Sequence, residues 1–488
     1  MSAPFIQIRI VMKQKSTRYH VSRRDFLKNS SAAAAGLFTS SLLRPDFSKH
    51  SLPVSNQILI RRASILTMDD EIGDFETADI LIEDDHIKEI APEIEAGSDV
   101  EIVNASNHIV MPGFIDTHRH MWQGALRNIL PDGRLGDYMN IVTGQARDVF
   151  RPEDAYIGNL ITALSALDSG VTTVLDWSHI GNSPEHTNAA IEALREAGIR
   201  SVYAFGSGSS TPDNLFPEDI HRLRNEHFTT DDQLLTLALA AGINRSQWEL
   251  AREVGARISV HVNGTGDLLP LSDHIGPDVT CIHCCNLLEK EWLLLADKAA
   301  GVSISAPVEM IMGHGVPPIQ QTLDYEIITS LSVDVETTVP SNIFSQMRSI
   351  LTLQRMQLLS RERDGEENLP VLLTACEVLK FATLNGAIHN GLENRTRSLT
   401  PGKKADLIML SADSINIMPV NNAYGAVVMG MDRANIKMVM VNGSIKKWKG
   451  KILYNRLDEI REEAFSSNQY IYEQTGWEKN IFQTPVCN

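Results

Sequence analysis

Eight short apolar runs recur through the middle of this 488-residue chain, and helical segments separate most of them. The runs are residues 109–116, 171–177, 199–206, 234–240, 257–263, 279–284, 301–307 and 331–336. Runs of this kind, rich in leucine and β-branched residues, are typical of strands buried on both faces. Eight strand–helix units over roughly 250 residues predict an α/β fold, namely a (β/α)8 TIM-like barrel.

The segments that flank the barrel have the alternating pattern of half-exposed strands. Residues 51–112 contain several short strands with a turn at Asp84 and Asp85, and residues 396–455 return to strands and turns. Neither segment looks complete alone, so we expect a small β-sandwich domain built from both chain ends. The predicted organisation is therefore a signal and linker in 1–50, the barrel in 113–395 and a tail in 456–488.

The N-terminal region contains the sequence SRRDFLK at residues 22–28, before a mildly apolar, alanine-rich stretch. The pair Arg23 and Arg24, followed by Phe26, Leu27 and Lys28, matches a twin-arginine export signal. The alternative is an ordinary basic amphipathic start, because no clean A-x-A cleavage site follows. We expect export to the periplasm or cell envelope, and a cytoplasmic location if the signal interpretation is wrong.

The chain is acidic, with 44 Lys and Arg against 61 Asp and Glu and a net charge of −17. This balance argues against nucleic-acid binding, whose affinity depends on basic patches. Beyond the N-terminal region, no apolar run is long enough to cross a bilayer. The expected partner is therefore a small molecule, with no nucleic acid and no stable membrane span.

Polar side chains that bind metals occur at the ends of four predicted strands. His118 and His120 end the first strand and point to the same side, because side chains alternate along a strand. His261, His283 and Asp334 lie at the ends of the fifth, sixth and eighth strands. Strand ends of a barrel meet at one face, so these side chains are expected to converge. Each alone is compatible with a hydrogen-bonded core group, but a shared metal would remove the cost of burying four of them.

Seven segments carry a family resemblance: PGFIDTHRH (112–120), GVTTVLD (170–176), SVHV (259–262), CIHC (281–284), the aspartate of SVDV (332–335), ATLNGA (382–387) and LTPGKKADLIML (399–410). In this order they resemble the amidohydrolase superfamily, in particular its cytosine deaminase-like and triazine hydrolase-like members. The resemblance covers about residues 56–450. It implies a distorted barrel beside a small β-sandwich, as the apolar pattern also predicts.

The resemblance implies a metal-dependent hydrolase. It makes His118, His120, His261 and Asp334 the ligands of one divalent metal, zinc or alternatively iron. A water activated by the metal would be the nucleophile, Asp334 would also accept its proton, and His283 would contact the water or the developing oxyanion. Relatives with two metals bridge them through a lysine or glutamate on the fourth strand. The sequence LLTLALAAG offers neither, so we expect one metal.

The match breaks after His261. Deaminases of this kind carry a glutamate three residues later, where this chain has Gly264. That glutamate protonates the ring of the substrate, so another acid is needed for ring deamination. Either another acid reaches the site, or the substrate needs no ring protonation. Glu309, after the seventh strand, and His179, after the second strand, are the candidate acids; we take Glu309 as the catalytic residue and place His179 in the substrate site. The alternatives are a structural ion pair for Glu309 and a loop hydrogen bond for His179.

Further residues are expected near the barrel mouth. Trp122, Gln123 and Trp177 are interpreted as substrate-binding residues, because two tryptophans there could flank a flat or apolar substrate. The alternative interpretation is packing beneath the rim of the barrel.

The leading functional hypothesis is hydrolysis of a non-peptide carbon–nitrogen bond, by deamination or by opening a cyclic amide or amidine. A metal-dependent lyase, such as a decarboxylase or hydratase on the same barrel, is the alternative, because a fold does not fix a reaction. A non-catalytic binding protein would be expected to lack a ligand, yet all four ligand positions are filled. The resemblance also implies a homo-oligomer.

Overall fold

The structure is a computed structural model that describes residues 56–483. The segment interpreted as an export signal, residues 22–43, lies outside the described residues.

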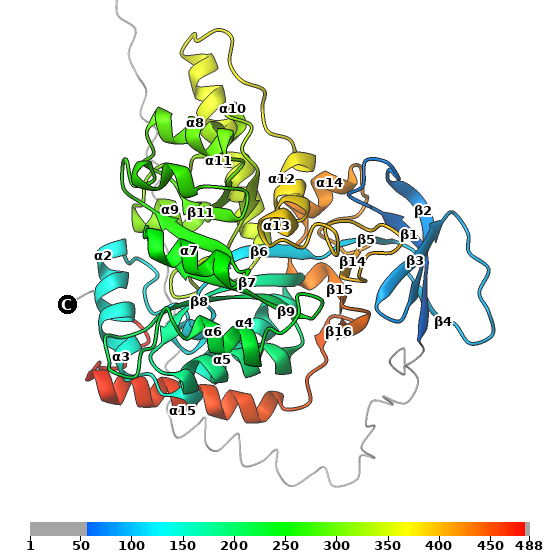
Figure 1. Cartoon of the computed structure of the whole chain (residues 1–488). Coiled ribbons are helices and arrows are strands. Elements are labelled where there is room, and N and C mark those ends of the chain that lie inside the picture. Colours follow the sequence, from blue (N-terminus) through cyan, green and yellow to red (C-terminus); the bar gives the residue numbers. More distant parts are fainter. Residues whose placement is uncertain (1–55, 484–488) are drawn as a thin grey trace, which may run out of the picture. The chain divides into compact units, whose positions relative to one another are not determined.

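A parallel eight-stranded sheet forms the centre of the described chain (Figure 1). The strands neighbour one another in chain order and are β6 (Phe114–Arg119), β7 (Val171–Gly181), β8 (Arg200–Ser207), β9 (Leu235–Ala241), β10 (Arg257–Val262), β11 (Val279–His283), β12 (Gly301–Ile304) and β13 (Thr329–Leu331). The first and last strands meet, because Thr117 Oγ1 donates a hydrogen bond to the Leu331 carbonyl at 3.0 Å. The predicted barrel is confirmed, and the sheet is nearly closed.

Helices follow the strands and cover the outside of the barrel (Figure 1). The helices between successive strands are α4 (Pro152–Asp168), α5 (Pro184–Ala197), α6 (Ile220–Glu226), α7 (Arg245–Glu253), α8 (Glu289–Asp297), α9 (Ala306–Met312) and α10 (Ile319–Asp324), and α11 (Ile343–Arg363) follows β13. In α4, Ile157, Leu160 and Leu164 are buried at helical spacing. The chain then turns at Gly170, whose φ of +85° suits a residue without a Cβ, and enters β7.

The first and last predicted strands differ most from the structure in their boundaries. Residues 109–116 belong to two strands, since β5 (His108–Pro112) joins another sheet and β6 begins after Gly113. A Cβ at Gly113 would lie 2.1 Å from Thr172 Cγ2, so the crossing requires glycine. At the other end, β13 stops before Asp334, which lies in the loop beyond the strand.

The two flanking segments form one nine-stranded sheet beside the barrel (Figure 1). Its strands are β1 (Gln57–Ile65), β2 (Phe75–Glu83), β3 (His86–Ala91), β4 (Glu101–Asn104) and β5 from the N-terminal side, and β14 (Leu407–Ser411), β15 (Ile436–Val441), β16 (Ser444–Trp448) and β17 (Lys451–Ile452) from the C-terminal side. Strand β5 pairs with β14, which joins the two chain ends directly. The turn between β2 and β3 falls at Asp84 and Asp85, as the sequence predicts.

Two buried ion pairs connect this sheet to the barrel. Arg200, the first residue of β8, makes two hydrogen bonds to Asp406 at 2.6 and 3.1 Å. Lys447 on β16 lies 2.9 Å from Asp168 at the end of α4. Both basic side chains are 2% exposed, so each pair depends on its partner to offset the loss of solvation.

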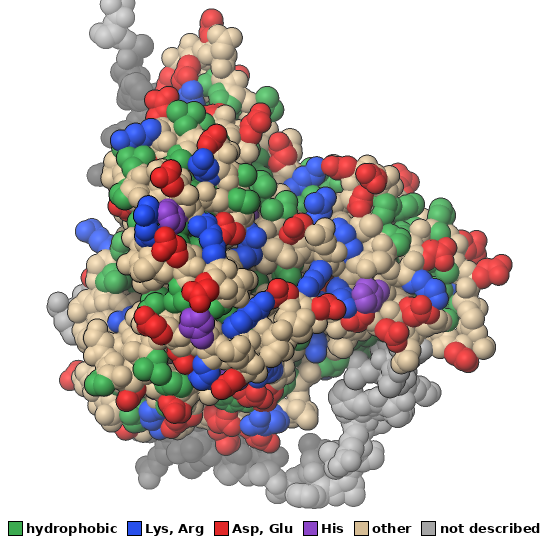
Figure 2. All heavy atoms as spheres, viewed as in Figure 1, with side chains coloured by type: hydrophobic (Ala, Val, Ile, Leu, Met, Phe, Trp, Pro, Cys, Tyr) green, Lys and Arg blue, Asp and Glu red, His purple; other side chains and the backbone are tan. Residues whose placement is uncertain are grey.

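The residues after the last strand form a long helix, α15 (Leu457–Thr475), which packs against α4. Over the face of the molecule in Figure 2, acidic and basic side chains are interspersed. Within residues 56–483, no helix is long and apolar enough to cross a membrane.

Candidate metal centre and active site

The four metal ligands predicted from the sequence, together with His283, come from the carboxyl ends of the barrel strands. His118 lies near the end of β6 and His120 directly after it, while His261 and His283 lie at the ends of β10 and β11. Asp334 follows β13 by three residues. In a parallel barrel this face carries the active site, because all the strand–helix loops meet there.

Backbone strain marks two of these positions. His283 has φ of +70° and Asp334 has φ of +69°, a conformation that non-glycine residues rarely adopt. The backbone of Asp334 is held by two hydrogen bonds to β6, because its N–H donates to the His118 carbonyl and its carbonyl accepts from His120 N–H, both at 2.9 Å. Strain of this kind concentrates at functional sites, where neighbouring contacts maintain it.

The ligand atoms converge on one point. His118 Nε2 lies 3.2 Å from His261 Nε2 and 3.2 Å from Asp334 Oδ1. His120 Nε2 lies 3.4 Å from the same Asp334 oxygen. The other carboxylate oxygen, Oδ2, lies 3.6 Å from His283 Nε2.

These separations fit the ligands of a metal ion. Ligands arranged tetrahedrally about 2.1 Å from one ion are about 3.4 Å apart, close to the His118–His261, His118–Asp334 and His120–Asp334 separations. Two overlapping groups, His118–His261–His283 and His118–His120–Asp334, each have all their ligand atoms within 4.8 Å of one another. The residues present therefore form a group that could hold a metal ion.

The protonation of His120 suits a ligand. Its Nδ1 donates a hydrogen bond to the Trp177 carbonyl at 2.8 Å, which leaves the Nε2 lone pair facing the centre. Burial and the neighbouring His118 lower the pKa of His120 to about 3. Burial likewise lowers the pKa of His118 and of His261. The imidazoles are thus neutral at physiological pH, which is the form that binds metals.

His283 is held from behind by a buried carboxyl group. Its Nδ1 lies 3.2 Å from Glu309 Oε1, and the same oxygen accepts a hydrogen bond from Ser305 N–H at 2.8 Å. Burial opposes a charged His283, but the hydrogen bond to Glu309 and the charge of Asp334 raise its pKa above the usual value. Glu309 is fully buried and does not line the cavity in front of His283.

A cavity of about 290 Å³ opens in front of the ligands. Its walls combine polar groups of the site with apolar side chains, and they include His120, His261, His283, Asp334, Trp177, His179, Tyr138, Arg147, Asn263, His314, Met139 and Met312. This size is at the low end for small-molecule sites. The cavity therefore suits a small substrate whose reacting atom lies beside Asp334.

A model of the amidohydrolase family matches residues 109–446 of this chain. That range includes every strand of the barrel and all five converging side chains. The chain belongs to the amidohydrolase family.

Two curated relatives of this amidohydrolase are deaminases. A 5'-deoxyadenosine deaminase from Methanosarcina barkeri is 25% identical over 434 residues, which are 83% of this chain and 96% of the relative. A 5-methylthioadenosine/S-adenosylhomocysteine deaminase from Caldicellulosiruptor saccharolyticus is 24% identical over 435 residues, with the same coverage of both chains.

Solved structures share the fold of this amidohydrolase. An adenosine deaminase from Xanthomonas campestris with bound zinc has a TM-score of 0.74 at 17% identity, covering 85% of this chain and 98% of its own. An atrazine chlorohydrolase from Arthrobacter aurescens TC1 complexed with zinc has a TM-score of 0.74 at 21% identity, covering 84% of this chain and all of its own.

The residues expected at the barrel mouth of this amidohydrolase divide into two groups. Trp177 and His179 line the cavity, and the Trp177 ring centroid lies 4.4 Å from that of His261. Trp122 and Gln123 are fully buried and do not line it. Trp122 Nε1 donates to His179 Nδ1 at 3.2 Å, and Gln123 Nε2 donates to Tyr138 Oη at 2.6 Å. These two side chains therefore hold residues of the cavity wall and lie beneath the rim.

Sequence analysis did not single out Tyr138, Met139 or Arg147, although all three line the cavity. They lie on the connection between β6 and α4, which contains the short helices α2 (Leu135–Tyr138), η3 (Met139–Ala146) and α3 (Arg147–Val149). The length of this connection in the sequence could have indicated that it contributes to the site, because strand–helix loops at the carboxyl face carry the site residues of a barrel.

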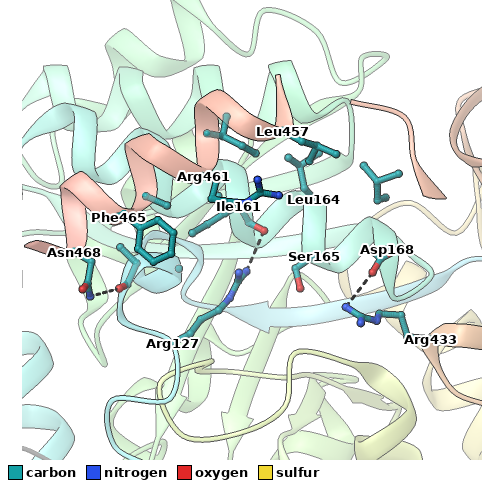
Figure 3. Close-up of a pocket in the computed structure, with 15 residues that line it drawn as sticks. Arg127, Ile161, Leu164, Ser165, Asp168, Arg433, Leu457, Arg461, Phe465 and Asn468 are labelled. Atoms are coloured by element: carbon teal, nitrogen blue, oxygen red, sulfur yellow. Dashed lines mark hydrogen bonds and ion pairs between the residues drawn. The ribbon is translucent and has the colours of Figure 1, made fainter. Parts of the chain in front are cut away.

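A larger cavity, of about 560 Å³, lies outside the barrel between α4 and α15 (Figure 3). Its lining includes Arg127, Ile161 and Phe465 and none of the converging metal-binding side chains. The basic groups in it are engaged, since Arg127 donates to the Ile161 carbonyl at 3.0 Å and Arg433 lies 3.1 Å from Asp168. We place the active site in the smaller cavity.

Proposed function

We propose that this amidohydrolase hydrolyses a non-peptide carbon–nitrogen bond in a small substrate, by deamination or by opening a cyclic amide or amidine. The observation that carries the proposal is the clustering of His118, His120, His261 and Asp334 beside the cavity, in which His118 lies 3.2 Å from His261 and from Asp334, and His120 lies 3.4 Å from Asp334. The relatives that are deaminases support the same bond type.

The four converging residues would hold one divalent metal. When bound, the metal supplies Lewis-acid activation of a water for attack on the carbon. Asp334 has a second carboxylate oxygen, Oδ2, available beside the ligand point, and this oxygen can accept the proton of the attacking water. Burial opposes the ionisation of Asp334, but hydrogen bonding to His118 and the adjacent imidazoles lower its pKa, so it is an anion at neutral pH.

His283 faces the same point from the opposite side of Asp334. Its Nε2 can donate to the oxygen that becomes negative as water adds, and Glu309 favours the protonated ring that makes this donation possible. Glu309 acts through His283, so we assign it a positioning role in place of direct proton transfer to the substrate.

His314 offers a hydrogen-bond acceptor in the cavity of a chain that lacks the usual glutamate. Its Nδ1 lies 3.3 Å from the Asn263 side-chain oxygen, and its Nε2 is buried without a hydrogen-bond partner. Burial and His283 lower the pKa of His314 to about 4, so the ring is neutral and Nε2 is an acceptor. We propose that His314 accepts a hydrogen bond from the amino or ring N–H group of the substrate.

We propose zinc as the metal and one ion per chain. Three imidazoles and one carboxylate form a donor set that zinc accepts, and related folds have been solved with bound zinc. The residues of β9 include neither lysine nor glutamate, so the described strand supplies no bridging ligand for a second ion. We also propose self-association, which light scattering of the purified chain would test.

Metal analysis and a substrate screen test the proposal together. Protein produced with zinc supplied is expected to contain about one equivalent of metal, and His261→Ala should lose most of it. His221→Ala, which removes an exposed histidine from α6, is the matched control and should retain the metal. Aminopyrimidines, aminotriazines, cyclic amides and 5'-deoxyadenosine would then be screened for ammonia release or ring opening.

Three outcomes are decisive. Ammonia release or ring opening that is lost in His261→Ala and kept in His221→Ala supports the hydrolase. Release of carbon dioxide or addition of water across a double bond would replace it with the lyase alternative. Normal turnover by protein that contains no metal would contradict the proposed mechanism.

A further inference from the structure

Arg147 is the one lysine or arginine among the described residues that line the active-site cavity. It opens α3, directly after η3, and its carbonyl accepts a hydrogen bond from Asn182 Nδ2 at 2.9 Å. Asn182 follows β7, the strand that carries Trp177 and His179. The backbone that presents the guanidinium is therefore fixed to the barrel.

The guanidinium of Arg147 makes no hydrogen bond or ion pair with another described residue. Its Nε is buried and has no hydrogen-bond partner. The negative charge of the adjacent Asp148 acts on Arg147, but the two side chains are not paired, and the Asp148 carboxylate accepts a hydrogen bond from Ser209 Oγ at 2.5 Å. The side chain of Arg151, four residues further on, is paired: it makes two hydrogen bonds to Asp154, at 2.8 and 2.9 Å.

A partly buried cation without a counter-ion is unfavourable, and a bound anion would offset this cost. The fork of N–H groups on arginine matches a carboxylate in plane and spacing. The surrounding wall is otherwise neutral near Arg147, with Tyr138, Met139 and Thr143 on the same connection. The cavity thus presents a metal-binding end and a cationic group within one small volume.

We propose that Arg147 binds a carboxylate of the substrate, so that the substrate is an amino-heterocycle or cyclic amide that carries a carboxylate. This inference rests on the proposed hydrolase function and narrows its substrate class.

Matched pairs of compounds test the inference. Each core is offered as the carboxylate and as its neutral carboxamide: cytosine-5-carboxylate with cytosine-5-carboxamide, and dihydroorotate with dihydroorotamide. A phosphonate of the cytosine core tests whether any anion suffices. The metal-loaded protein is compared with Arg147→Gln, Arg147→Lys and Arg134→Gln, where Arg134 is an exposed arginine before α2 that does not line the cavity. Ligand-induced thermal shift reports binding, and ammonia release or ring opening reports turnover.

We expect the carboxylate of at least one pair to bind roughly 10- to 100-fold more tightly than its carboxamide. Arg147→Gln should remove this preference and leave binding of the carboxamide unchanged, Arg147→Lys should keep part of it, and Arg134→Gln should keep all of it. If the carboxylate and the carboxamide of every pair produce the same thermal shift, or if neither produces any, the inference is overturned. A stronger preference for the phosphonate would also overturn it.

The two readouts separate this inference from the proposed function. Carboxylate binding that depends on Arg147 without any turnover would retain the anion site and reject the hydrolase. Turnover of carboxamides with no effect of Arg147→Gln would retain the hydrolase and reject the anion site.

Discussion

At the scale of single residues, burial sets the protonation of groups around the site. Asp176, in the middle of β7, is fully buried. Its Oδ1 accepts one hydrogen bond, from Met121 N–H at 3.2 Å, and its Oδ2 has no partner. Burial raises the pKa of Asp176 to about 7. This carboxyl group therefore keeps a proton that a solvent-exposed aspartate would lose.

The raised pKa predicts a pH-dependent loss of stability. Between about pH 4 and pH 7 the folded chain binds a proton at Asp176 that the unfolded chain has released, so stability falls as pH rises through this window. Asp176→Asn keeps the acceptor oxygen and removes the titration. We expect the free energy of unfolding of the parent, relative to the variant, to fall by roughly 3 kcal/mol between pH 5 and pH 8. Denaturant unfolding at fixed metal content would measure it, and a difference between the two proteins that stays constant with pH would contradict it.

Glu309 gives a second prediction at this scale. Glu309→Gln keeps a hydrogen-bond acceptor for His283 Nδ1 but removes the negative charge that raises the pKa of His283. We expect kcat to fall about 10- to 100-fold with metal content unchanged. The limb of the pH–rate profile that reports His283 should move to lower pH.

Glu249→Gln is the matched control for Glu309→Gln, because Glu249 lies 3.2 Å from His274 in a surface pair outside the cavity. It should leave both kcat and the pH profile unchanged. If Glu309→Gln lowers metal content and kcat together, or neither, the positioning role is incorrect.

At the scale of elements, the apolar pattern was sufficient to predict the eight barrel strands, because parallel strands are buried on both faces. It could not resolve where one sheet ends and the next begins. In the sequence, Pro112 and Phe114 belong to one continuous apolar run. In the structure they belong to different sheets, and the chain crosses at Gly113, where a Cβ would clash with Thr172. For the same reason, Asp334 was expected at a strand end, whereas its left-handed backbone places it in a loop.

The site was predictable in part for a similar reason. Histidines at strand ends converge as a consequence of barrel topology, so His118, His261 and His283 could be grouped from sequence. Side chains on the β6–α4 connection could not, because helix η3 has no pattern that fixes which of its faces meets the cavity. Arg147 was missed on this account, since its lack of an ionic partner is visible only in three dimensions.

The contact between the barrel and the nine-stranded sheet gives a prediction at the scale of elements. Arg200 on β8 is bidentate with Asp406 and also donates to the Asn442 side chain at 3.0 Å, all in a buried position. Arg200→Leu would leave the Asp406 carboxylate buried without its cation. We expect a loss of about 3–5 kcal/mol in the free energy of unfolding, measured by denaturant titration.

Arg200→Lys and Arg222→Leu provide the comparison. Lysine keeps the charge but not the bidentate geometry, so it should recover part of the loss. Arg222 of α6 pairs with Asp219, the residue before that helix, in a less buried position, so Arg222→Leu should cost clearly less than Arg200→Leu. Equal losses for the two leucine variants would show that the buried link is not a major source of stability.

At the scale of the whole molecule, the residues of the candidate metal centre come together only in the folded chain. Its ligands span residues 118–334, from the first strand of the barrel to the loop after the last. Metal affinity is therefore coupled to folding, and removing the metal should destabilise the protein. If the chain binds its metal before export, the metal that it holds afterwards is one that it bound in the cytoplasm.

Such coupling would suit export by a twin-arginine route, since that route carries folded proteins. We propose that SRRDFLK at 22–28 directs such export. Replacing both Arg23 and Arg24 by lysine keeps the positive charge, so a merely electrostatic role predicts normal export. A twin-arginine role predicts that a C-terminally tagged chain accumulates in the cytoplasm, with its metal content and activity intact. Fractionation followed by immunoblotting measures the distribution, and Arg18→Lys outside the motif controls for loss of a nearby arginine. Equal export of the parent and the double variant would reject the twin-arginine interpretation while leaving the metal centre unaffected.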